Sequence, residues 1–79
     1  MSPTVFREGN VRYFFFSREE PRMHIHVASP DGEAKFWLQP SVEVAENHGI
    51  PAHRLATIRD TIERRYDEIT AKWHAHFGR

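Results

Sequence analysis

Apolar positions alternate with polar ones through the first half of the chain and recur every three or four residues through the second half. An alternation with period two is typical of strands, and the longer period is typical of helices. Glycine, proline and clusters of charged residues separate the apolar runs of the first half. We therefore predict four strands, over residues 4–7, 11–17, 23–28 and 33–38.

The period changes after Gln39 and Pro40. Ser41 is a candidate N-cap for a short helix reaching about Asn47, which Gly49 would end. A helix of roughly 25 residues would follow, with an apolar stripe along one side. The stripe consists of Leu55, Ile58, Ile62, Tyr66, Ile69, Trp73 and Phe77. The prediction is a single α+β domain over residues 1–79: a four-stranded antiparallel β-meander in residues 1–40, then a helical half in residues 41–79, with the short helix and the long C-terminal helix packed on one face of the sheet.

The third and fourth strands form a hairpin if residues 29–32 make the turn. Antiparallel pairing then places His26 opposite Lys35 and His24 opposite Trp37 on one face. The opposite face is entirely apolar and is the predicted core side, with Met23, Ile25, Val27, Ala34, Phe36 and Leu38. The inference depends on register, because a shift of one residue would turn a strand over.

The same alternation gives the sheet a second aromatic side. Val5, Tyr13 and Phe15 join the core side, whereas the histidine side gains Phe6, Arg12, Phe14 and Phe16. One helix stripe covers one face, so the second would expose an unusually large apolar patch. Four candidates could cover it: residues 73–77, a second copy of the chain, another protein, or a single-stranded nucleic acid.

Composition narrows the choice of partner. Eleven basic and eleven acidic side chains cancel among 79 residues, so no overall charge attracts nucleic acid or an anionic membrane. The absence of cysteine excludes disulfides and thiolate chemistry. The sequence shows no signal peptide and no apolar run long enough to span a membrane, so we expect a cytoplasmic protein with no membrane partner.

His24 and His26 leave several functions open. Their spacing suits two ligands of zinc or iron, but nothing singles out a third ligand, so we predict neither a metal nor a cofactor. Beside Lys35, the two imidazoles could act as acid and base on a phosphodiester, with Lys35 stabilising the charged transition state. That arrangement would make a metal-independent endoribonuclease with His24, His26 and Lys35 as catalytic residues. Whether the protein is an enzyme stays open at this point.

Two non-catalytic functions use the same face. Histidine and tryptophan are common at protein interfaces, so His24, His26 and Trp37 are also candidate contact residues. Alternatively, the aromatic rings could stack on RNA bases while Lys35 and Arg12 bind phosphates. For either function the candidate binding residues are Arg12, Phe14, Phe16 and Trp37.

With these residues laid out, the chain resembles the bacterial family of domains of unknown function numbered 4160. The resemblance covers nearly the whole length and is carried by Pro3-Thr4-Val5, Tyr13-Phe14-Phe15-Phe16-Ser17, His24-Ile25-His26-Val27, Glu33-Ala34-Lys35-Phe36-Trp37-Leu38 and Trp73. In that family the first histidine usually follows a proline, whereas here it follows Met23.

The resemblance implies a small stand-alone protein, often encoded beside a second small protein, and this layout is that of a toxin–antitoxin system. We therefore expect a protein-interaction module that binds a partner encoded nearby through the face of His24, His26, Lys35 and Trp37. A second copy of the chain and RNA are the other candidate partners.

Overall fold

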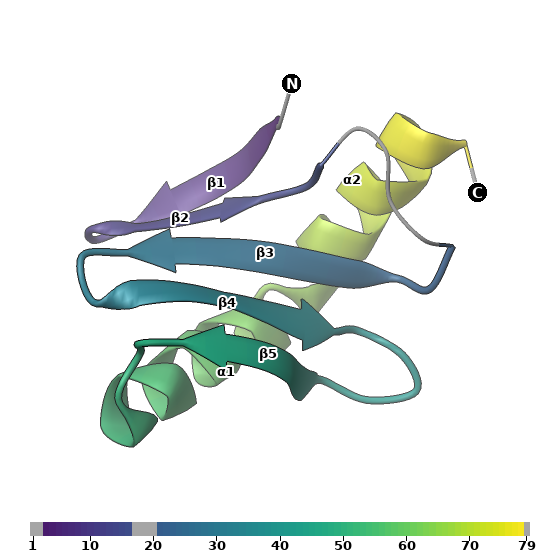
Figure 1. Cartoon of the computed structure of the whole chain (residues 1–79). Coiled ribbons are helices and arrows are strands. Elements are labelled where there is room, and N and C mark those ends of the chain that lie inside the picture. Colours follow the sequence, from purple (N-terminus) through teal and green to yellow (C-terminus); the bar gives the residue numbers. More distant parts are fainter. Residues whose placement is uncertain (1–2, 17–20, 79) are drawn as a thin grey trace.

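Five antiparallel strands form one sheet in the computed structural model, which describes residues 3–16 and 21–78 (Figure 1). The strands are β1 (Thr4–Glu8), β2 (Val11–Phe14), β3 (His24–Ser29), β4 (Gly32–Trp37) and β5 (Glu43–His48). Each strand pairs with the next in the chain, in the order β1-β2-β3-β4-β5. The predicted α+β class and β-meander are confirmed, with one strand more than expected. Ser17, predicted to end the second strand, lies outside the described residues.

The β3–β4 hairpin has the predicted register. His24 pairs with Trp37, His26 pairs with Lys35, and Ser29 pairs with Gly32 across the turn. All six residues of the predicted core side of this hairpin are buried. The strict alternation of apolar and polar residues on both strands fixed the register, because a slip would expose the apolar set.

The prediction of a short helix from Ser41 to Asn47 is wrong, because this segment contains β5. Val42 and Val44 alternate with polar neighbours, and β-branched residues favour strands. A helix of about seven residues gains little by itself, whereas β5 bonds along the free edge of β4. The sheet therefore outcompetes the local capping signal.

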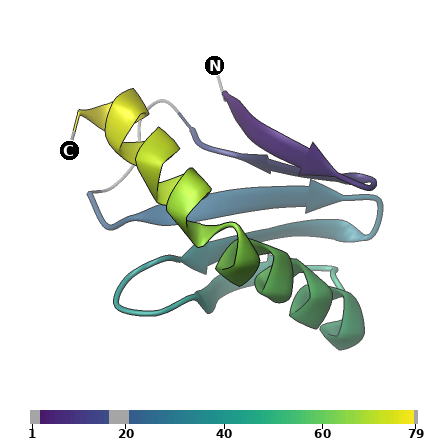
Figure 2. The ribbon, with the colours of Figure 1, turned by 180° about the vertical axis from the view of Figure 1, so that it is seen from behind.

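The predicted long helix is two helices, α1 (Ala52–Arg64) and α2 (Tyr66–Phe77). Arg65 breaks the helix with φ −108° and ψ 23°, although its backbone N–H still donates to the carbonyl of Thr61. Both helices cross the same face of the sheet (Figure 2). The predicted apolar stripe faces that side, and its members Ile58, Ile62, Ile69 and Trp73 are buried.

A bulge in β1 places Phe6 on the opposite side of the sheet from the side predicted for it. The β1–β2 register shifts between Thr4 and Phe6, so Phe6 pairs with Tyr13. Its ring stacks on Tyr13 at 4.5 Å, and the guanidinium of Arg65 lies 3.5 Å from its centroid. Phe6 therefore faces the helices, and its assignment to the histidine face is wrong. An extra residue in a strand reverses the alternation beyond it.

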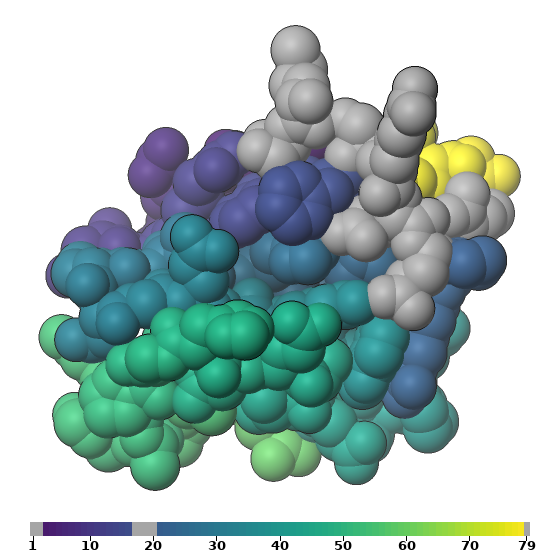
Figure 3. All heavy atoms as spheres, viewed as in Figure 1, coloured from purple at the N-terminus to yellow at the C-terminus, as the bar shows by residue number. Residues whose placement is uncertain are grey.

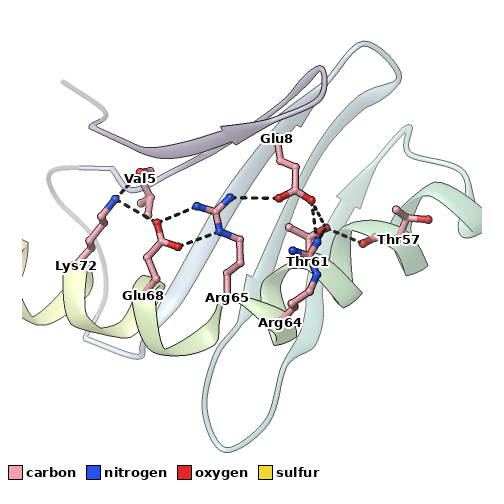
Figure 4. A network of polar contacts seen from close by, with 8 residues as sticks. All are labelled: Val5, Glu8, Thr57, Thr61, Arg64, Arg65, Glu68 and Lys72. Carbon is pink, nitrogen blue, oxygen red and sulfur yellow. Dashed lines mark hydrogen bonds and ion pairs between the residues drawn. The ribbon is translucent and has the colours of Figure 1, made fainter.

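A polar network ties β1 to the helices (Figure 4). The Glu8 carboxylate accepts hydrogen bonds from Thr61 at 3.2 Å, Arg64 at 2.8 Å and Arg65 at 3.2 Å. These bonds, that from Arg64 above all, hold the pKa of Glu8 below its usual value. Arg65 also donates two hydrogen bonds to Glu68. The break between the helices thus lies where one arginine joins both helices to β1.

Candidate binding face of the sheet

The outer face is the side of the sheet turned away from α1 and α2. Strand pairing orders its side chains in three rows that run across the strands. The first row is Arg7, Arg12, Ala28, Glu33 and His48, the second is Thr4, Phe14, His26, Lys35 and Glu46, and the third is His24, Trp37 and Glu43. No described helix covers this face, which is the side seen in Figure 3.

Aromatic rings form the centre of the outer face. The His26 ring stacks on Phe14 at 5.5 Å and meets Phe16 edge-on at 4.4 Å, measured between ring centroids. Phe14 and Phe16 also contact each other at 5.4 Å. Phe14 is buried within this cluster, whereas Phe16 remains 43% exposed. A large exposed aromatic ring beside other rings is typical of a binding surface.

Cationic side chains lie over these rings. The guanidinium of Arg12 is 4.4 Å from the centroid of Phe14. On β4, Trp37 is covered by Arg22 at 4.0 Å and by Lys35 at 4.5 Å. Each contact is a cation–π interaction, worth about 0.5–1 kcal/mol at an exposed site. The cations are thereby held flat against the face.

His24 connects the outer face to the core. Its side chain is fully buried, at 0% exposure, and its Nδ1 lies 2.6 Å from the carbonyl oxygen of Arg22. The β2–β3 register runs from Arg12 and Ala28 to Phe14 and His26, and His24 lies two residues beyond its end. Trp73 of α2 reaches the imidazole at 5.2 Å, while Trp37 contacts it at 5.9 Å.

Charge is distributed unevenly across the outer face. Arg7 and Arg12 carry positive charge on the β1–β2 side, whereas three glutamates, Glu33, Glu43 and Glu46, outnumber the one cation Lys35 among the strand-paired residues of the β4–β5 side. Between them the face is hollowed, as Figure 3 shows for the region in front of β3 and β4. The hollow has a volume of about 430 Å³ and is lined by Phe16, His26, Glu33, Ala34, Lys35, Glu46 and His48.

The structure brings every predicted site residue to the outer face. His24 and His26 are neighbours at 5.1 Å, and Lys35 pairs directly with His26. Arg12, Phe14, Phe16 and Trp37 surround them. The acidic side of the face was not predicted from the sequence, because Glu43 and Glu46 lie in the segment for which a short helix was expected. The alternation of Val42 and Val44 was the available signal for that strand.

Two other kinds of site find no support in the described residues. Among residues 3–16 and 21–78, no group of three or more histidine, aspartate or glutamate side chains could hold a metal ion. In the same part of the chain, no helix has both the length and the apolar character needed to cross a membrane.

The fold and the face together define a small α+β domain with one helix-covered sheet face and one aromatic, charged outer face. The family model described as Domain of unknown function (DUF4160) matches residues 10–74, and the chain belongs to this family. The resemblance expected from the sequence is thereby confirmed. No curated protein and no solved structure matches the chain.

Proposed function

We propose that the protein is an interaction module whose outer face binds a partner protein. The observation that carries this proposal is the aromatic cluster of Phe14, Phe16 and His26, in which the Phe16 ring is exposed on a sheet face that no described helix covers. Aromatic anchors with arginine at their rim are the residues that dominate binding energy at protein interfaces. The partner we propose is the product of a neighbouring gene, in a two-gene, toxin–antitoxin-like system.

RNA binding is supported less well by the same face. Bases could stack on Phe16 and Trp37, with Arg12 and Lys35 near phosphates. However, Glu33, Glu43 and Glu46 line the other side of the face, and carboxylates repel a phosphate backbone. A protein partner can match both signs of charge, whereas a nucleic acid matches only one.

The endoribonuclease alternative requires two imidazoles that reach a substrate. The His24 ring is fully buried between Trp37 and Trp73. A general acid or base must come within hydrogen-bond reach of the reacting proton, so the burial of His24 weighs against this function. His26 and Lys35 remain near the surface of the hollow.

The test is binding of the partner by variants of two aromatic residues of the outer face, the exposed Phe16 and the half-buried Trp37. The partner is captured from host lysate, identified by mass spectrometry, purified, and titrated against the chain by calorimetry. Phe16→Ala and Trp37→Ala should each weaken binding at least about tenfold, the loss expected for an anchor worth more than about 1.4 kcal/mol. Val44→Ala is the matched control, because Val44 is a similarly exposed apolar residue that lies beside α1 on the other side of the sheet.

Two results would count against the proposal. One is a complex that forms equally well with both aromatic variants. The other is the cleavage of RNA by the purified protein, together with loss of this activity in a folded His26→Ala variant. The second result would favour the endoribonuclease function instead.

A further inference from the structure

We propose that in the free protein the outer face is covered by the outer face of a second copy, with the two sheets stacked about a two-fold axis parallel to β3. This inference rests on the proposal that the outer face binds protein. It adds that, in the absence of another partner, the protein bound there is a second copy of the chain. The charge pattern, the shape of the face and the form of the sheet edges all favour this occupant.

Charge complementarity between Arg12 and Glu33 favours an axis parallel to the strands. β3 is the central strand, so an axis along it places β2 of one copy over β4 of the other. Arg12 and Glu33 belong to the same row and lie on either side of β3. Arg12 of each copy would therefore face Glu33 of the other copy. The symmetric interface contains this ion pair twice, because a two-fold contact is isologous.

An axis at right angles to the strands does not give this match. It would place β2 over β2 and β1 over β1. The described outward-facing residues of these two strands are Thr4, Arg7, Arg12 and Phe14, and none of them is acidic. Arg7 and Arg12 would then meet no described carboxylate on the facing β1 and β2, so this axis forms no ion pair for them.

The shape of the face agrees with the same axis. Phe16, the exposed ring, follows β2, whereas the hollow extends across β4 to Glu46 and His48 of β5. Phe16 itself lines the β2 rim of the hollow, and rotation about β3 brings this rim in one copy over the β4 side of the hollow in the other. The Phe16 ring of each copy would therefore enter the hollow of its partner, where it would be removed from water.

The edges of the sheet disfavour the competing mode of self-association, in which edge strands pair. The β1–β2 register shifts between Thr4 and Phe6, and the β4–β5 register shifts between Lys35 and Phe36. Irregularities of this kind protect edge strands from pairing with another chain.

A charge exchange tests the arrangement. The purified chain is studied alone by sedimentation velocity over a range of concentrations, with Arg12→Glu and Glu33→Arg as variants. The wild type should be a dimer, and each variant should dissociate at least about tenfold more readily, since its homodimer opposes two like-charged pairs. An equimolar mixture of the two variants should regain the dimer, because both pairs in the mixed dimer are attractive.

Matched controls separate this effect from a general change in charge. Arg59→Glu and Glu63→Arg alter charge by the same amounts on α1, away from the outer face, and should leave the dimer intact. Thermal melts of all variants verify folding. Double exchange in one chain, Arg12→Glu with Glu33→Arg, should also restore the dimer.

The outcomes distinguish this inference from the proposed function. A wild type that stays monomeric, or variants whose mixture does not associate, would overturn the two-fold arrangement even if the partner protein binds normally. RNA that co-purifies in stoichiometric amount with a monomeric chain would overturn it as well. A dimer that responds as expected, in a protein whose Trp37→Ala variant binds the partner unchanged, would support the inference and refute the assignment of the partner to this face.

Discussion

Gly32 is the position where a single added methyl group should disturb the acidic side of the outer face most. A Cβ atom at Gly32 would lie far inside the van der Waals contact distance to the His48 carbonyl oxygen, 3.0 Å from the His48 carbonyl carbon and 3.1 Å from the Gly49 Cα. All three are backbone atoms, so no side-chain rotation relieves the clash. The turn after β5 must move, and the pairing of Glu33 with His48 moves with it.

The cost of Gly32→Ala follows from this geometry. Forcing a methyl group into a packed site usually costs about 1–3 kcal/mol, and a clash with three backbone atoms belongs at the upper end, about 3 kcal/mol. For a domain of this size each kcal/mol lowers the melting temperature by about 4–8 °C, so we expect a fall of at least about 12 °C. Thermal unfolding followed by circular dichroism measures it.

Gly9→Ala is the matched control for that experiment. Gly9 has φ of 61°, but no atom lies within 4 Å of the position of an added Cβ. Only the left-handed backbone is penalised, by roughly 1 kcal/mol, which corresponds to a fall of about 4–8 °C. Equal shifts for the two variants would refute the reasoning, because the contact with the β5 turn would then contribute nothing.

Four further predictions concern the core and the ionisable groups. The pKa of Glu8 is lowered in the folded protein, so its stabilising effect is complete above the unfolded value of 4.5 and is lost as the pH falls below it. In a plot of melting temperature against pH, Glu8→Gln should therefore reduce the fall seen at acidic pH. Burial raises the pKa of Tyr13 above 10.0, so wild-type stability should decline as the pH rises past 10.0, and Tyr13→Phe should remove this decline in alkaline melts. Trp73→Ala should cost about 3–5 kcal/mol in denaturant unfolding, since only 1% of the side chain is exposed. His24→Ala should destabilise the fold measurably more than His26→Ala in the same assay, because His24 is fully buried against Trp73 whereas His26 is half-buried on the outer face.

Sequence reasoning succeeded where several residues repeated one pattern. The β3–β4 hairpin has two strands of alternating residues that must bury the same face, so the register had one solution. The same applies to Ile58, Ile62, Ile69 and Trp73, whose spacing marks the buried side of the helices. The candidate site followed from the hairpin, since the polar residues of alternating strands share a face.

Sequence reasoning failed where a single tertiary contact decides the local structure. The break at Arg65 depends on Glu8, which is far away in the chain and reaches the helices only after β1 has joined the sheet. The reversal of Phe6 depends on one extra residue in β1, and the alternation of residues does not reveal it. β5 depends on the free edge of β4, which exists only in the folded sheet.

The two faces of the sheet explain why such a short chain presents an interaction surface at all. The helical half contains 13 residues in α1 and 12 in α2, and both helices pack on one face. A second cover for the outer face would need another layer of similar length, which the chain does not contain among its described elements. The aromatic residues on that face therefore contribute little to the core, and their exposure would lower the solubility of an isolated monomer. Burial of Phe16 and Trp37 against a second protein surface resolves this conflict, whether the surface is another copy or a different partner.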